Sequence, residues 1–226
     1  MAEYLNTKGR RSEEHPHSNS MSYRHDIFLS YKRHPETLKW IKDHFLPLLD
    51  LRVSMELGRQ VDIFVDDQID AGTSWPQQLG VELSASRILL PLWTRTYFTS
   101  KWCTCEMSNM MAREGLTGCR TLANPRGIIV PAIIHDGDTF PAEIGHINHI
   151  EIQKCFNVRM SRESKRAEDL DDILMQHAPA VATAISNAPD WQSNWSDETA
   201  ATFFRLFHLQ DGTSQDTVPR FSGGTS

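Results

Sequence analysis

The chain has 226 residues, of which 39% are hydrophobic and 23% charged, and its formal net charge at pH 7 is −6. This length and composition predict one large globular domain with extensions. The negative charge argues against a general nucleic-acid-binding protein. No apolar run suits a membrane-spanning helix or a secretory signal, and the four cysteines lack a disulfide-framework spacing, so we expect a reduced, cytoplasmic protein with no membrane contact.

The composition divides the chain into three predicted parts. Residues 1–23 carry few large apolar side chains, so we expect a flexible N-terminal extension. The folded domain is predicted over residues 24–187. Residues 188–226 form a predicted C-terminal extension, with a candidate helix at 197–209 followed by a flexible tail rich in Gly, Ser and Thr.

Short apolar segments bounded by polar residues predict the β-strands. The segments lie at residues 25–31, 61–65, 87–92, 127–134 and 149–152. The fourth segment is the most hydrophobic and the fifth is the weakest. Pro131 within the fourth predicts a sheet edge, a bulge or an early strand end, because proline has no backbone N–H to donate.

Apolar residues at helical spacing predict helices between and after the strands. The candidate helices lie at residues 37–57, 74–83, 100–114, 168–187 and 197–209. Pro47 predicts a kink or a break in the first helix, Gly58 its end, and Pro179 an interruption of the fourth. The last helix carries aromatic residues that either pack on the domain or bind a partner, namely Phe203, Phe204 and Phe207.

Strands that alternate with helices predict an α/β protein with a parallel sheet and helices on both of its faces. In such proteins, ligands bind beyond the carboxyl ends of the strands, in the loops that follow them. The loops concerned span residues 31–36, 66–74 and 93–100. We therefore expect the functional site at this edge of the sheet.

A tryptophan and a glutamate follow the third of these loops. A helix capped by Thr99 or Ser100 places Trp102 and Glu106 four residues apart, on one face of the helix. A carboxylate beside an aromatic surface suits a site for an oxocarbenium-like sugar centre. The alternative is a surface glutamate next to a half-buried tryptophan, and the spacing alone leaves both interpretations open.

Other residue patterns give no comparable site. Cys103 and Cys105 lie two residues apart on a helix and so point to different faces, while His146 and His149 lack matching ligands nearby. The chain has no Walker-A motif and no G-x-G-x-x-G motif, and no Ser/His/Asp arrangement stands out. We therefore expect no metal and no bound cofactor.

The order of motifs resembles that of a TIR (Toll/interleukin-1 receptor) domain over about residues 24–187. The resemblance is carried by residues 26–33, 61–75, 91–94, 97–106 and 130–134. The second of these includes the BB loop of the family, and the fourth ends in Trp-x-x-x-Glu, which is typical of TIR domains that cleave NAD. The resemblance implies a flavodoxin-like TIR fold with a central five-stranded parallel sheet.

The resemblance also implies one of two functions. In one class of TIR domains a glutamate on the helix after the third strand is catalytic, and Glu106 occupies that position. This implies an NAD glycohydrolase that releases nicotinamide and ADP-ribose or a cyclic isomer, in prokaryotic antiphage defence or as an effector. The alternative is a non-enzymatic signalling adaptor that acts through TIR–TIR contacts. Outside the family, a nucleoside-processing enzyme remains an alternative.

The resemblance assigns roles to residues along the expected edge of the sheet. Glu106 is the expected catalytic carboxylate, with NAD as substrate. The expected substrate-binding residues are Trp102, Ser30, Tyr31, Lys32, Arg33, Asp70, Ala71 and Gly72. For Phe28 and Trp75, a place in the core is favoured over ligand contact. The family also implies a homo-oligomer formed by TIR–TIR contacts, with an activating trigger from another protein or a small molecule.

Overall fold

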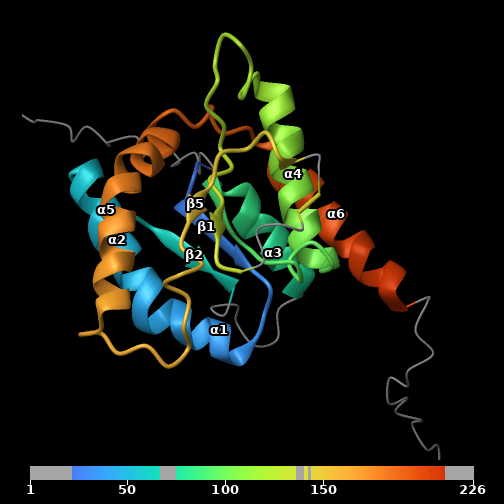
Figure 1. Ribbon diagram of the computed structural model, residues 1–226. Helices are drawn as coiled ribbons and strands as arrows, with labels where there is room; N and C mark the ends of the chain where they lie inside the picture. Colours follow the sequence, from blue (N-terminus) through green and yellow to red (C-terminus); the bar gives the residue numbers. More distant parts are fainter. Residues whose placement is uncertain (1–21, 67–74, 136–139, 142–143, 212–226) are drawn as a thin grey trace, which may run out of the picture.

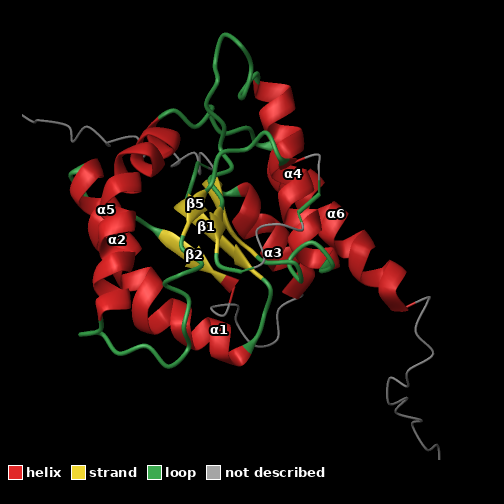
Figure 2. Ribbon diagram, in the orientation of Figure 1, coloured by secondary structure: helices red, strands yellow, loops and turns green. Residues whose placement is uncertain are grey.

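The computed structural model describes residues 22–66, 75–135, 140–141 and 144–211. Within these residues, five parallel strands form one sheet in the order β2-β1-β3-β4-β5. The strands are β1 (His25–Tyr31), β2 (Ile63–Val65), β3 (Ser86–Trp93), β4 (Ala132–Ile133) and β5 (Ile150–Glu151). The predicted α/β class and flavodoxin-like strand order are confirmed, and Figure 2 shows the sheet between two groups of helices.

Helices cover both faces of this sheet (Figure 1). One group consists of α1 (Pro35–Trp40), the π-helical turn η1 (Ile41–Phe45), α2 (Leu46–Leu57) and α5 (Lys165–Ser186). The other group consists of α3 (Trp75–Ser84), α4 (Lys101–Thr117) and α6 (Asn194–Asp211). Because both faces are covered, nearly every residue of β1 and β3 is buried, which explains their continuous apolar runs.

The first helical segment shows how Pro47 is accommodated. Its helix begins at Pro35, two residues before the predicted start, because His34 Nδ1 accepts a hydrogen bond of 3.3 Å from the Glu36 amide. The chain then widens into η1, where the Leu46 amide donates to the Ile41 carbonyl five residues back. This turn separates α1 from α2, so the predicted break occurs just before Pro47.

Some predicted bounds are wrong. Strand β4 comprises Ala132–Ile133 instead of residues 127–134, because Pro131 cannot donate to the ladder and only an isolated bridge, Leu89 to Ile129, precedes it. Pro179 does not interrupt α5. The proline leaves the carbonyl of Met175 without its helical donor, and Met175 is 50% exposed, so water can replace the lost hydrogen bond.

The C-terminal helix α6 is longer than predicted and packs against α3 and α4. Phe203 has no exposed surface and Trp195 is only 5% exposed, so this helix covers part of the domain. The side chains of Phe204 and Phe207 lie outside the described residues, as do residues 1–21 and 212–226 of the predicted extensions. No helix in the described ranges has the length and apolar character needed to cross a membrane.

Candidate functional site

The site is organised by the start of α4, which follows β3 after a loop of residues 94–100. Ser100 caps this helix, because its hydroxyl accepts a hydrogen bond from the Cys103 amide at 3.5 Å. Of the two predicted caps, Ser100 is therefore the one used. The cap fixes where the helix begins, and so Glu106 falls in its second turn, on the side that faces the sheet.

The carboxyl group of Glu106 lies inside the protein, against the end of β1. Its residue is only 4% exposed, and it accepts a hydrogen bond from the hydroxyl of Ser30. The hydroxyl oxygen of Tyr97 lies 2.8 Å from Ser30 Oγ and 3.3 Å from the carbonyl oxygen of Cys103. Strand β1, the loop after β3 and helix α4 thus bring two hydroxyl groups and one carboxyl group into a connected network.

Burial determines the charge of this carboxyl group. The pKa of Glu106 is raised from 4.5 to about 8, chiefly because burial removes water from the carboxylate, and the nearby Asp66 carboxylate acts in the same direction. The Ser30 hydrogen bond and the positive charge of Arg33 both lower this pKa. Glu106 is therefore largely protonated at neutral pH in this structure, and small changes in its surroundings decide its ionisation.

An ion pair connects the loop after β1 with the end of β2. Arg33 Nε donates to Asp66 Oδ2 at 2.7 Å, and its Nη2 donates to the Asp66 carbonyl at 3.1 Å. The Arg33 side chain is 51% exposed, so its outer face can meet a ligand. Asp66 was part of a sequence motif but was not among the predicted site residues.

A pocket of about 270 Å³ opens beside Arg33, between the loops that follow β1 and β3. It is lined by Lys32, Arg33, His34, Thr37, Leu92, Thr94, Thr96 and Ile134. Two cations and several hydroxyl groups suit a ligand with phosphates and sugar hydroxyls. Arg33 lines this pocket, and its positive charge also acts on Glu106.

The structure brings only part of the predicted set together. Ser30 contacts Glu106, whereas Tyr31 is 5% exposed and, as the next residue of the strand, points to the opposite face of the sheet. The ring of Trp102 stacks on Phe203 of α6, with 6.0 Å between the ring centroids. The predicted BB-loop residues Asp70, Ala71 and Gly72 lie outside the described residues.

Tyr97 is the main site residue that sequence reasoning missed. It has no exposed surface, and its ring meets Phe98 edge to face, with 5.3 Å between centroids. The available signal was its position, because it lies in the loop after the third strand, where ligands were expected. Phe28 is fully buried, as predicted, and its ring centroid lies 5.1 Å from that of Phe64. The side chain of Trp75 lies outside the described part of the structure.

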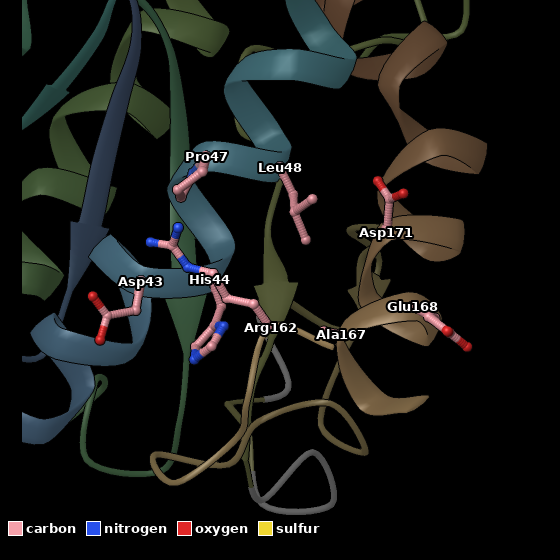
Figure 3. A pocket seen from close by; sticks show the side chains of 8 residues that line it. All are labelled: Asp43, His44, Pro47, Leu48, Arg162, Ala167, Glu168 and Asp171. Atoms are coloured by element: carbon pink, nitrogen blue, oxygen red, sulfur yellow. The ribbon is translucent and has the colours of Figure 1, made fainter. Parts of the chain in front are cut away.

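A second pocket, of about 320 Å³, lies between η1, α2 and α5 (Figure 3). Asp43 and His44 of η1, Glu168 and Asp171 of α5, and Arg162 are among the residues that line it. Three carboxylates and one arginine line this pocket, whereas two cations and no carboxylate line the pocket beside Arg33, so the second pocket suits a ligand with several phosphates less well. The pocket beside Arg33 is therefore the better candidate for a dinucleotide.

Among the described residues, we find neither a reactive cysteine nor a metal-binding cluster. Burial raises the pKa of Cys103 to about 12 and that of Cys105 to about 11, so both thiols stay protonated and are poor nucleophiles. All four cysteines are free. No group of three or more His, Cys, Asp or Glu side chains within the described ranges could hold a metal ion.

Comparison with known proteins gives one informative match. A family model described as a TIR domain matches residues 27–170, which is more than half of the chain. No curated protein matches the chain. Among solved structures, the TIR domains of "the activated Roq1 resistosome directly recognizing the pathogen effector XopQ" align with 17% identity and a TM-score of 0.34, over 83% of this chain and 98% of that one. The family assignment therefore rests on the family model.

Proposed function

Because the chain belongs to the TIR domain family, we propose that it cleaves the nicotinamide–ribose bond of NAD, with Glu106 as the catalytic carboxylate. The observation that carries this proposal is the buried carboxyl group of Glu106, held by Ser30 at the ligand-binding edge of a parallel sheet. A pocket lined by two cations opens at the same edge of the sheet.

The reaction needs one carboxylate and no metal or bound cofactor. The bond between the ribose C1′ and the nicotinamide nitrogen breaks, and its electron pair leaves with nicotinamide, which departs neutral. The ribose becomes an oxocarbenium-like cation, which an adjacent carboxylate stabilises. Water, or another group of the same molecule, then bonds to C1′ and loses a proton. The ionised form of Glu106 stabilises the cation and accepts that proton, and its raised pKa of about 8 makes this form a stronger base.

Substrate contacts follow from the pocket beside Arg33. Lys32 and Arg33 supply the charges that would bind the pyrophosphate, and Thr94 and Thr96 supply hydroxyl groups. Asp70, Ala71 and Gly72 are proposed to complete the site within the same copy or from a neighbouring copy. Trp102 serves this site indirectly in the proposal, through its position one helical turn before Glu106.

Access to Glu106 requires a change from the conformation described here. The residue is only 4% exposed, so substrate can reach its carboxyl group only when the surrounding loops move. Self-assembly through TIR–TIR contacts, in response to a partner protein or a small molecule, would supply that change. Such a switched activity suits cytoplasmic NAD depletion or signalling in prokaryotic antiphage defence, or the action of an effector.

One experiment separates the enzyme from an adaptor. The purified protein is incubated with NAD, and the products are resolved by chromatography beside Glu106→Ala and Glu106→Gln variants. We expect nicotinamide with ADP-ribose or a cyclic isomer from the wild type, and neither from the two variants. Glu56→Gln, at an exposed position of α2, is the matched control and should retain activity. Undiminished turnover in folded Glu106→Ala would reject the assignment, and an inactive wild type would favour the adaptor.

A further inference from the structure

Helix α6 contacts the helix that carries Glu106 at a point one turn before it. The ring of Phe203 in α6 stacks on that of Trp102, with 6.0 Å between centroids and an interplanar angle of 28°. Phe203 has no exposed surface, and Trp102 is partly buried. Aromatic stacking in a buried setting resists sliding of the two rings, and so it ties the beginning of α4 to α6.

A second contact lies two turns beyond Glu106. Arg113 is only 5% exposed, and it donates to the carbonyl of Ser86 at 2.9 Å and, at longer distance, to that of Ser84 at 3.4 Å. Its guanidinium carbon lies 4.3 Å from the ring centre of Trp195 in α6. Trp195 therefore covers a buried cation whose hydrogen bonds attach α4 to the start of β3.

The two contacts and Glu106 share one side of α4. Trp102, Glu106 and Arg113 are separated by four and then seven residues, which are spacings of one and two helical turns. Around the second contact, α4 and α6 leave a hollow of about 140 Å³, lined by Arg113 and Trp195 and, in part, by Asn109 and Thr199. Helix α6 thus holds α4 at two points on either side of Glu106, and the packing at the second point is incompletely filled.

From this geometry we propose that α6 positions the catalytic helix, with Phe203 and Trp195 as its positioning residues. The inference rests on the proposed function of Glu106, because it concerns the same reaction. The described helix α6 begins at Asn194, beyond the residues 27–170 that match the TIR family model, so it adds a level of control from outside the matched region. Loosening it would tilt α4 and weaken the hydrogen bond from Ser30 to Glu106.

The kinetic test uses two substitutions at one position. Phe203→Ala removes the stacked ring, and we expect kcat for NAD cleavage to fall about 10- to 100-fold, because a misplaced catalytic group is costly. KM should change by less than about twofold, since the cations of the binding pocket are untouched. Phe203→Leu fills much of the lost space and should recover most of kcat.

The control separates positioning from general loss of stability. Leu174→Ala removes a side chain of α5 that is 1% exposed, on the opposite face of the sheet. It should lower the melting temperature to an extent comparable to Phe203→Ala, yet leave kcat per folded molecule unchanged well below that temperature. An equal loss of kcat in Leu174→Ala and Phe203→Ala would overturn the proposal.

Amide hydrogen exchange provides a readout that does not depend on activity. In Phe203→Ala, we expect faster exchange along residues 101–117 and unchanged exchange along residues 165–186. Unchanged exchange along residues 101–117 would overturn the proposal even if activity fell. If the wild type fails to cleave NAD, the proposed function fails, and the exchange result still decides whether α6 holds α4.

Discussion

Ser30, at the end of β1, donates its hydroxyl hydrogen to the carboxyl group of Glu106 in α4, across 76 residues of sequence. The contact joins a central strand of the sheet to the helix that covers it. It also acts on ionisation, because a hydroxyl that donates to a carboxylate favours the charged form. Burial acts in the opposite direction and is the larger effect, so the pKa of Glu106 rises to about 8.

Ser30→Ala should therefore shift the pH dependence of NAD cleavage. Without the donated hydrogen bond, the pKa of Glu106 rises further, so a smaller fraction of the carboxylate is present at neutral pH. We expect the rising limb of kcat to move to higher pH. An upward shift of one unit would lower the rate at pH 7 roughly tenfold.

Rates measured from pH 6 to pH 9.5 test this expectation. Ser54→Ala is a matched control, because its hydroxyl accepts from the Val61 amide at 2.9 Å in a part of the fold remote from Glu106. The control should keep the wild-type profile. A limb that stays in place in Ser30→Ala, or moves to lower pH, would contradict the role given to Ser30.

Glu106→Gln should stabilise the fold, and more so at higher pH. The folded pKa of about 8 lies above the reference value of 4.5, so between these values the folded state holds a proton that the unfolded state releases. The contribution of Glu106 to the free energy of unfolding of the wild type therefore falls as pH rises from about 4.5 to about 8. Glutamine is neutral throughout and avoids this loss, which is worth about 1.4 kcal/mol for each pKa unit.

Melting temperatures of the two proteins, compared from pH 5 to pH 9, measure the effect. The difference between variant and wild type is the relevant quantity, because other carboxylates, such as Asp26 beside Arg59, have lowered pKa values and titrate in the opposite sense. We expect the difference to grow from pH 5 and to level off above pH 8. A constant difference would show that Glu106 is already ionised in the folded protein.

The fold could be predicted from sequence because its signals are local. Continuous apolar runs identified β1 and β3, and Gly58 ended α2 as expected, with a φ of 66°. The predicted bounds were wrong where the effect of a proline depended on its structural surroundings. Pro131 shortened β4 because ladder pairing needs a donor. Pro179 sits inside α5, where Met175, the residue whose carbonyl loses its donor, is half-exposed.

The site was harder to predict because it depends on which face each side chain occupies. Glu106 and Ser30 were both expected, but nothing in the sequence showed that Ser30 would contact Glu106 while Tyr31 turned away. The partner of Trp102 came from beyond the matched region, since Phe203 is 101 residues later in the chain. Tyr97 was missed because a buried tyrosine in a loop has no periodic signal.

Arg33→Ala should weaken substrate binding more than catalysis. The guanidinium lines the pocket and is half-exposed, so its loss removes a phosphate contact. We expect KM for NAD to rise about tenfold, in line with the 1.5–3 kcal/mol of a hydrogen bond to a charged group. A modest fall in kcat should accompany it, because Arg33 also lowers the pKa of Glu106.

Steady-state kinetics at pH 7.5 separate the two effects. Lys39→Ala is the control, because this exposed lysine pairs with Asp43 on α1 and η1, outside the pocket beside Arg33. It should leave both constants unchanged. If Arg33→Ala left KM unchanged and reduced only kcat, Arg33 would act on Glu106 alone, and the pocket would not hold the phosphates.

Glu114→Gln should destabilise the fold without touching the site. The Glu114 carboxylate is 5% exposed and accepts from the amides of Ile128 and Ile129 at 2.7 and 3.0 Å, and from Arg120 Nε at 2.9 Å. These contacts attach the end of α4 to the segment before β4. Glutamine keeps the shape but loses the charge, so we expect a loss of about 2 kcal/mol.

Urea denaturation measures this loss, and Glu56→Gln on the exposed side of α2 is its control. Gly127→Ala offers an independent check, because a Cβ there would overlap Glu114 Oε1 and the Arg120 guanidinium and push the pair apart. Both variants should lower the unfolding midpoint. A Glu114→Gln variant as stable as the control would show that the amide contacts alone hold this end of α4.

Activity per molecule should rise with protein concentration. Glu106 is only 4% exposed in a single copy, so substrate access depends on a change that contact with a second copy would supply. Initial rates are divided by protein concentration, and light scattering measures the assembly state of the same samples. The rate per molecule and the degree of assembly should increase together. A flat profile across the range in which the protein assembles would contradict activation by assembly.

A mixing experiment identifies what the second copy contributes. Inactive Glu106→Gln protein is added in excess to wild type that is too dilute to assemble. If the neighbour supplies loop residues such as Asp70, Ala71 and Gly72 rather than its own Glu106, the inactive copies can complete the site, and the rate per wild-type molecule should rise. A rate that stays constant or falls, despite mixed assembly, would mean that each copy builds its site alone.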